Sequence, residues 1–255
     1  MMRPSQEAKS GGNMARPVVA AMQPNLFPYL GYINLIARAD IWVVLDFLQY
    51  TKNGWMNRNR ILHPARSWQY VTVPVHSAPQ KTKINQIRFI SDSDVALQLI
   101  GKLNHYRIKR APYYSAVVQL VESTFSRTPS DLLWELSINS IAVICEYLAL
   151  PFAPVIGSEH NFNFSAVKHS GQWTLEIASQ LGAGTYINPP NGRAIYVAEE
   201  FHERGMELAF IRAPSFTYDC APYSFIPHLS MLDVLMWCSP EQVREQFFTD
   251  PIDYA

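Results

Sequence analysis

A continuous apolar run with acidic residues at both ends places the strongest constraint on the fold of this chain. Residues 41–45 read Ile-Trp-Val-Val-Leu and lie between Asp40 and Asp46. An uninterrupted run of β-branched and aromatic residues is typical of a strand that is buried on both faces. Residues 17–23 form a second apolar run, which ends at Pro24. The two runs predict a short, buried central sheet.

Helical periodicity dominates the middle of the chain. Behind Ser130, the expected cap, apolar residues recur at i, i+3 and i+4 spacing up to residue 148. By the same criteria we expect helices over residues 30–38, 92–108, 113–125, 130–148, 165–181, 230–237 and 241–248, and further strands over residues 68–75, 84–90, 185–187 and 207–211. Gly182, Ser230 and the pair Ser239-Pro240 mark helix ends.

This order of elements predicts an α+β, or mixed α/β, fold with a short central sheet and a helical middle section, similar to the arrangement in cysteine proteases. Residues 14–255 are expected to form one catalytic domain, in which residues 92–150 form a helical subdomain. Residues 1–13 are polar and lack the apolar core of a secretory signal, so we expect a disordered tail there.

The composition argues against several classes of function. Lys and Arg number 21, as do Asp and Glu, so the formal net charge is zero. A neutral chain supplies no field for wrapping a polyanion, which argues against nucleic-acid binding. The sequence has no run of about 18 apolar residues, so we expect no membrane span. The sparse cysteines, without a C-x-x-C spacing, fit a reducing cytoplasm.

Bound metals and nucleotide cofactors also lack a signature in the sequence. The seven histidines show neither H-x-x-x-H nor H-E-x-x-H spacing. No Walker A or G-x-G-x-x-G motif occurs. We therefore expect no metal and no resident cofactor, while the oligomeric state stays open.

Polar side chains follow directly after the predicted buried strands. Gln23 comes after the first strand, and Asp46 and Gln49 come after the second. Groups at strand ends stand on rigid supports and converge on a crevice, which suits binding or catalysis. The stretch 57–59 adds two amides and a guanidinium. The alternative is that these side chains hold a long connection in place through hydrogen bonds to the backbone.

A distinctive set of motifs extends from this segment over most of the chain. The motifs are Gln23-Pro24-Asn25, Phe27-Pro28, Leu30-Gly31-Tyr32, Leu45-Asp46, Gln49-Tyr50, Trp55, Asn57-Arg58-Asn59-Arg60, Thr72-Val73-Pro74-Val75, Ala111-Pro112-Tyr113, Gly182-Ala183 with Tyr186, and Phe225-Ile226-Pro227 with Leu229-Ser230 and Leu232-Asp233. Together they resemble the signature of the WbqC-like protein family. Within the opening block, the residues expected to bind substrates are Gln23, Asn25, Asp46, Gln49, Tyr50, Trp55, Asn57, Arg58 and Asn59.

The resemblance implies a role in surface-polysaccharide or natural-product assembly. Some WbqC-like proteins are associated with attaching an aminoacyl group to an amino sugar. One branch resembles the lincosamide condensing enzymes, which join a carrier-bound alkylproline thioester to the amine of an amino sugar. On this basis we expect an amide-forming acyltransferase whose partners are an acyl or peptidyl carrier protein and a small amino sugar. The carrier would supply the 4′-phosphopantetheine.

Cys220 is the expected nucleophile. The family usually has Tyr-x-Gln before the Phe-Ile-Pro block, whereas this chain has Tyr218-Asp219-Cys220. Attack of a thiolate on a thioester is a near-thermoneutral exchange, and an amine can then open the acyl-enzyme without ATP. The alternative for any lone cysteine is a buried structural role, which we expect for Cys145 and Cys238.

A thiolate needs a base or a cation nearby. His76 directly follows a predicted strand and is preferred over His228, which lies eight residues after Cys220. Glu159 is a candidate for orienting the histidine, as is Asp46. By analogy with cysteine hydrolases, Gln23 would complete an oxyanion hole.

Two basic stretches are candidates for contacts with the donor. Lys102, Arg107, Lys109 and Arg110 lie along the end of a predicted helix and would dock an acidic carrier, although a helix dipole also favours cations there. Arg58 and Arg60, with Lys52, would meet a phosphopantetheine or nucleotide-sugar phosphate. The alternative function is an aminoacyl-transferring or nucleotide-sugar-binding protein of O-antigen assembly without a catalytic cysteine.

Overall fold

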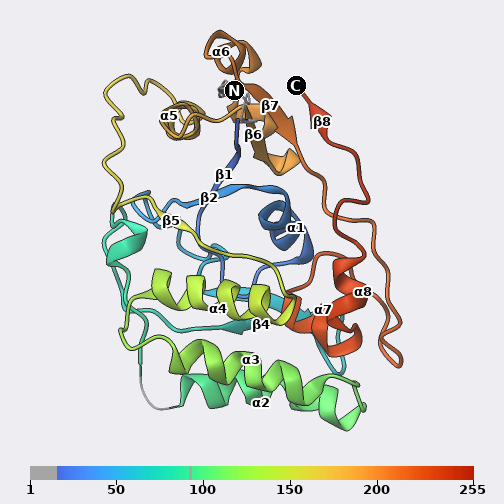
Figure 1. The fold of residues 1–255 in the computed structure, drawn as a ribbon. Helices are drawn as coiled ribbons and strands as arrows, with labels where there is room; N and C mark the ends of the chain where they lie inside the picture. Colours follow the sequence, from blue (N-terminus) through green and yellow to red (C-terminus); the bar gives the residue numbers. More distant parts are fainter. Residues whose placement is uncertain (1–15, 92–93) are drawn as a thin grey trace, which may run out of the picture.

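A mostly parallel sheet forms the centre of the computed structural model, which describes residues 16–91 and 94–255 (Figure 1). Its strands are β1 (Val18–Met22), β2 (Ile41–Val44), β5 (Val155–Ile156), β6 (Thr185–Asn188), β7 (Glu207–Phe210) and β8 (Asp253–Tyr254). The predicted α+β class is confirmed. The expected tail 1–13 and the expected helix start at residue 92 lie outside the described residues.

The strand order places a switch point between two neighbouring strands. The order along the sheet is β5-β2-β1-β6-β7-β8, and only β8 is antiparallel to its neighbour. From β1 the chain first adds β2 and β5 on one side, and later adds β6 and β7 on the other. A doubly wound sheet of this order opens a crevice at the carboxyl ends of the strands where the direction reverses. Here that place is between β1 and β6.

Both faces of the sheet are buried, as the uninterrupted apolar runs predict. Side chains alternate along β1, so Val19 and Ala21 face one layer and Ala20 faces the other. The first layer contains α5 (Gln172–Gln180) and α6 (Ala198–Glu203). The second contains α1 (Leu30–Arg38), whose bounds agree with the prediction.

The second layer continues into the helical middle of the chain. A two-stranded antiparallel ribbon, β3 (Arg58–Leu62) with β4 (Trp68–Thr72), packs there (Figure 1). The helices around it are α2 (Val95–Ile108), α3 (Tyr114–Ser126), α4 (Leu133–Tyr147), α7 (Met231–Trp237) and α8 (Pro240–Arg244). Their buried apolar side chains join those of the central sheet in one cluster. The ribbon is thereby fixed relative to the carboxyl end of β1.

Three of the predicted helix ends agree with the structure, whereas α4 begins at Leu133 with Leu132 as its N-cap residue instead of Ser130, and α8 ends at Arg244 instead of residue 248. Ser230 caps α7, because its side chain accepts a hydrogen bond from the Leu232 amide. Ser239 and Gln242 form a capping box at the start of α8. Gly182 follows α5 with φ of 70°, in the left-handed region that glycine tolerates.

Two predicted elements are wrong. The expected strand 84–90 is a 3₁₀ helix (Ile84–Gln86) followed by isolated bridges, because Ile84 and Ile87 are buried three residues apart rather than two. The expected helix over 165–181 begins only at Gln172, behind Gly171. A Cβ at Gly171 would lie 2.1 Å from the Ile195 carbonyl oxygen, so close backbone approach sets this start.

Candidate functional site

A cleft of about 730 Å³ opens at the switch point of the sheet. Asn25 comes from the segment after β1, and residues 189–191 come from the segment after β6. Residues 212–218 follow β7 and form the next wall. The remaining walls come from Pro28–Leu30, Trp55 with Asn59 and Arg60, residues 225–229, and Val234. The cleft therefore lies where a doubly wound sheet is expected to bind a ligand.

Arg60 brings a guanidinium group into this cleft without an ion-pair partner among the described residues. Its carbon Cζ lies 5.5 Å from the ring centre of Trp55 and 5.4 Å from that of Trp68. Its Nη2 donates to the His228 carbonyl at 3.3 Å, and its Nε is buried without a partner in the described chain. Two aromatic rings thus hold the cation in place and leave its charge available to a ligand.

The cleft has a positive electrostatic character. Arg212, which is exposed on the wall after β7, also lacks an ion pair within the described residues, and no Asp or Glu of that part of the chain lines the cleft. Leu30, the first residue of α1, lines it as well, so the N-terminal end of the helix dipole adds partial positive potential. These groups favour an anionic ligand.

His228 lies in the cleft wall in a strained backbone conformation. Its φ is 58°, in the left-handed region that few residues other than glycine adopt. The Tyr29 ring meets the imidazole edge-on, with centroids 5.8 Å apart. The backbone conformation and the ring contact place the exposed imidazole at the cleft wall.

Close packing at the start of α1 shapes another wall. A Cβ added to Gly31 would lie 2.5 Å from the Tyr29 ring and 2.7 Å from the Ala213 Cβ. Both Tyr29 and Ala213 line the cleft. Glycine at this position therefore allows α1 and the segment after β7 to approach each other.

A buried carboxylate supports the cleft from below. Asp233 is fully buried and accepts hydrogen bonds from the Tyr218 hydroxyl at 2.7 Å, from the Leu62 amide at 3.1 Å, and from the Tyr106 hydroxyl. Burial, and then the Asp233 charge, raise the pKa of Tyr218, so its hydroxyl stays protonated and donates. Since Tyr218 lines the cleft, Asp233 is a positioning residue for that wall.

Cys220 is buried beside this carboxylate and does not line the cleft. Its Sγ donates to the Tyr223 carbonyl at 3.5 Å, and it is only 3% exposed. Burial, together with the charges of Asp233 and Asp219, raises the pKa of the thiol to about 11. In this arrangement Cys220 is a thiol at neutral pH, and its nucleophilic role stays a prediction. Cys145 and Cys238 are also buried and free.

Of the expected catalytic partners, only His228 reaches the cleft. His76 is exposed, and its backbone amide bonds to the Arg88 carbonyl. Glu159 is exposed in the turn after β5. Neither lines the cleft.

The expected substrate-binding residues separate into two groups. Asn25, Trp55 and Asn59 line the cleft, and Trp55 is 44% exposed there. The others lie outside it: Gln23, Asp46, Gln49, Tyr50, Asn57 and Arg58.

Several of these amides and carboxylates hold the backbone in place, as the alternative interpretation has it. Asn59 donates to the Leu26 and Phe27 carbonyls, at 3.1 and 2.9 Å. Asn57 donates to the Val73 carbonyl at 2.9 Å, and Gln49 to the Gln80 carbonyl at 2.7 Å.

Asp46, at the end of β2, is fully buried and accepts from the Ser158 amide at 2.8 Å. It therefore connects β2 to the turn after β5. Tyr50 donates to the Asn57 side chain at 3.3 Å, and Arg58 lies over the Tyr70 ring at 4.2 Å.

The four basic residues expected to dock a carrier lie on or just after α2. Lys102 donates to the Tyr70 carbonyl at 2.8 Å and thereby links α2 to β4. Arg107, Lys109 and Arg110 are exposed.

Arg212, Asn191 and Tyr218 are cleft residues that the sequence analysis missed. The strand-end rule that selected Gln23 and Asp46 also applies to two of them, because Arg212 follows β7 and Asn191 follows β6 by a few residues. The strand-end rule extended to all predicted strands would have found these two. Tyr218 carries no such signal.

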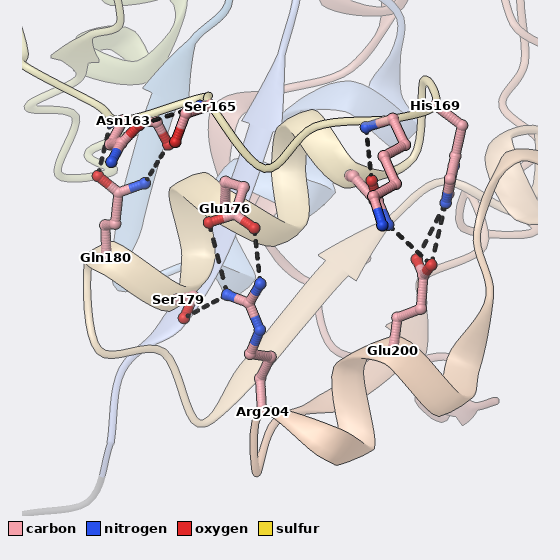
Figure 2. Close-up of polar contacts among 10 residues, drawn as sticks. Asn163, Ser165, His169, Glu176, Ser179, Gln180, Glu200 and Arg204 are labelled. Atoms are coloured by element: carbon pink, nitrogen blue, oxygen red, sulfur yellow. Dashed lines mark hydrogen bonds and ion pairs between the residues drawn. The ribbon is translucent and has the colours of Figure 1, made fainter.

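A second hollow of about 300 Å³ lies between α5 and the end of α6. Figure 2 shows that its polar side chains pair with one another: Arg204 binds the Glu176 carboxylate at 2.7 Å, and Gln180 exchanges two hydrogen bonds with the Asn163 backbone. Beside it, His169 meets Glu200 at 3.1 Å. These pairs join α5 to α6 and its flanking loop, and they leave little free capacity for a ligand.

Residues 16–91 and 94–255 contain neither a cluster of metal ligands nor a helix that could span a membrane. No group of three or more His, Cys, Asp or Glu residues is placed to hold a metal ion there. No helix in the same part of the chain has the length and apolar character needed to cross a membrane.

The comparisons with known proteins give one family and one relative. Residues 23–245 match the model of the WbqC-like protein family. A Mycobacterium tuberculosis protein described as uncharacterized protein Rv1507c is 26% identical over 223 residues, which covers 85% of this chain and 92% of the relative. No solved structure matches the chain. The expected likeness to cysteine proteases therefore stays a prediction.

Proposed function

This chain belongs to the WbqC-like protein family, and from that premise we propose that it is an amide-forming acyltransferase acting in the switch-point cleft. The donor is an aminoacyl group held as a thioester on the phosphopantetheine of a carrier protein. The acceptor is the amine of an amino sugar. The reaction belongs to natural-product assembly of the lincosamide type and takes place in the cytoplasm, where the free thiols of the chain stay reduced.

The character of the cleft is the observation that carries the proposal. Arg60 and Arg212 present positive charge without a carboxylate in the described lining, which suits the phosphate of a phosphopantetheine arm. Trp55, Tyr29 and Phe216 present aromatic rings on which a sugar or an aminoacyl chain packs. A volume of about 730 Å³ has room for the two reactants together.

Binding the two substrates side by side supplies the main part of the rate enhancement. The amine attacks the thioester carbon, a C–N bond forms, and the C–S bond breaks. His228 accepts the proton from the amine, and the thiolate that leaves is protonated to the free thiol. The Asn25 side chain, which has no hydrogen-bond partner in the described chain, donates to the carbonyl oxygen as negative charge develops. Proximity of this kind accelerates the reaction without a covalent intermediate.

The test must distinguish direct aminolysis from a route in which Cys220 forms an acyl-enzyme. Cys220→Ala removes the thiol from a site outside the cleft, so direct aminolysis keeps substantial rate in this variant. The assay is amide formation from prolyl-phosphopantetheine thioester and an amino sugar, followed by mass spectrometry. A covalent prolyl adduct on the wild-type protein, together with loss of amide formation in Cys220→Ala, would establish the nucleophile and reject direct aminolysis.

Arg60→Gln tests the cleft in the same assay. Hydrogen bonds to charged groups contribute about 1.5–3 kcal/mol, so KM for the thioester rises about 10- to 150-fold. Arg66→Gln, an exposed change outside the cleft, is the matched control and keeps the wild-type KM. Equal KM values for the two variants would reject the cleft as the donor site.

The same positive, aromatic cleft also favours a second function, the binding of a nucleotide sugar in O-antigen assembly. Such a ligand carries a diphosphate and a sugar ring, which the two guanidinium groups and the aromatic rings would accept. Titration with UDP-N-acetylglucosamine distinguishes the two. Tight binding of this ligand, in a protein that forms no amide, would favour the second function.

A further inference from the structure

Helix α2 presents two large apolar side chains to solvent along its outer face. Leu97 is 63% exposed and Ile108 is 68% exposed, although both are large and apolar. Together with Gly101 and Asn104 they follow i, i+4, i+7 and i+11 spacing, which places them on one side of the helix. We name these four residues the α2 stripe. The side of α2 that packs inward carries Val95, Leu99, Leu103 and Tyr106.

A glycine lies in the middle of the α2 stripe for no reason found within the described chain. Glycine is a poorer helix former than any residue except proline. A Cβ at Gly101 would meet no atom within 4 Å, so no internal contact requires its absence. A glycine on an exposed helix face allows another backbone to approach closely. Gly101 is thus an observation separate from the exposed apolar side chains.

The end of the stripe is basic and has no carboxylate partners in the part of the chain that the structure describes. Arg107, Lys109 and Arg110 are exposed and form no ion pair there. The helix dipole accounts for cations at this end. It does not account for Ile108, which is exposed between two of them.

Contacts connect α2 to the segments that line the cleft. Nδ1 of His105, on α2, lies 2.8 Å from the Tyr223 hydroxyl, and Phe225, two residues further along, lines the cleft. Lys102 holds the Tyr70 carbonyl of β4, and the Tyr70 ring packs edge-on against Trp68, which supports Arg60. Two chains of contacts therefore run from α2 to the cleft wall, one through Tyr223 and one through Tyr70.

We propose that the α2 stripe and its basic end form the docking surface for an acidic helix of the carrier protein that delivers the acyl donor. The inference rests on the proposed function. The α2 stripe would contact the helix itself, with Gly101 allowing a close approach. Arg107, Lys109 and Arg110 would pair with its carboxylates. Charge complementarity points to an acidic partner, because Arg107, Lys109 and Arg110 form a local excess of positive charge on a chain whose net charge is zero. Lys102 holds β4 and is not part of the surface.

The test compares two donors that carry the same acyl group. One is a prolyl-loaded peptidyl carrier protein of negative net charge, and the other is prolyl-pantetheine thioester, which has no protein part. Carrier binding is also measured directly, by fluorescence anisotropy, and so does not depend on turnover. The variants are Arg107→Glu with Lys109→Glu, and Gly101→Trp, which places a bulky side chain in open space. Lys81→Glu with Lys168→Glu, two exposed positions outside α2, makes the same change in net charge.

The proposal predicts that both α2 variants weaken carrier binding and raise KM for the carrier-bound donor on the order of tenfold. KM for the pantetheine thioester stays at the wild-type value, and the control double variant behaves like the wild type. Carrier binding that is absent from the wild-type protein, or unchanged in both α2 variants, would overturn the docking surface, as would an equal rise of KM for both donors. A wild-type protein that binds the carrier through α2 but forms no amide would retain the docking surface and reject the proposed function.

Discussion

Replacement of Asp233 measures how much the structure beneath the cleft depends on one buried acceptor. Asp233→Leu leaves the hydroxyls of Tyr106 and Tyr218 without their acceptor, whereas the Leu62 amide keeps the Tyr106 hydroxyl oxygen at 3.0 Å. An unpaired buried donor costs about 1–3 kcal/mol, so the two hydroxyls together cost about 2–6 kcal/mol. Part of this is offset, because burial raises the pKa of Asp233 and the charged form is itself disfavoured in the folded protein. The expected net loss is about 3–5 kcal/mol of unfolding free energy.

Asp233→Asn is the matched variant. It keeps the shape of the side chain and one acceptor oxygen, and a tyrosine hydroxyl can rotate to accept from the new amide. We expect a loss of about 1 kcal/mol or less. Urea denaturation at pH 7 measures both variants. Equal losses for the Leu and Asn variants would refute the reasoning, since the count of unpaired donors would then not set the free energy of unfolding.

The wild-type protein and Asp233→Asn also differ in how their free energy of unfolding depends on pH, and the pKa of Asp233 sets the sign of this difference. The pKa of Asp233 is raised in the folded protein above its ordinary value of 3.8, so the folded state binds this proton more tightly. The Asp233 contribution to stability therefore increases as pH falls through the raised pKa towards 3.8. Relative to Asp233→Asn, the wild-type protein gains unfolding free energy over this range. A relative loss would contradict the assignment.

Three other substitutions have expected outcomes. Burial lowers the pKa of His105 to about 4, so between pH 6.5 and 4 the unfolded chain binds a proton that the folded protein does not. His105→Gln therefore removes up to about one proton of uptake on unfolding. The pH dependence of urea denaturation measures this uptake, and an unchanged uptake would contradict the prediction. Ser239→Ala removes the cap of α8 and lowers the unfolding free energy by about 1 kcal/mol, whereas a loss below the error of thermal denaturation would mean that the cap is dispensable. Gly31→Ala brings a Cβ within 2.5 Å of the Tyr29 ring and lowers the free energy of unfolding by about 1–3 kcal/mol, as measured by urea denaturation. An unchanged or raised free energy of unfolding would show that Tyr29 and Ala213 move aside without cost.

The buried elements of the fold were predictable because their apolar patterns are unambiguous. The unbroken run of β2 and the periodic face of α4 have the buried positions that their sequences indicate. The ribbon strand β3 was not predicted, because Arg58, Asn59 and Arg60 read as a polar loop. It pairs with β4, and the Asn59 amide bonds to two backbone carbonyls, which are tertiary contacts that no local pattern contains.

The candidate site was predicted only in part. The motif block that resembles the WbqC-like family contained Asn25 and Trp55, whereas position at a strand end selected Asp46. The structure places the Asp46 carboxylate on the Ser158 amide instead, because β5 brings that turn against the end of β2. Arg212 reaches the cleft because β7 lies two strands from β1, and strand order is not readable from one sequence.

Direct binding of phosphopantetheine tests the central claim most simply, because it needs neither the carrier nor the sugar. Isothermal titration is carried out with the wild-type protein, with Arg60→Gln and Arg212→Gln, and with the control Arg66→Gln. The account predicts that each cleft variant raises Kd about 10- to 150-fold, corresponding to about 1.5–3 kcal/mol, and that the control binds like the wild type. The same Kd in all four proteins would contradict it.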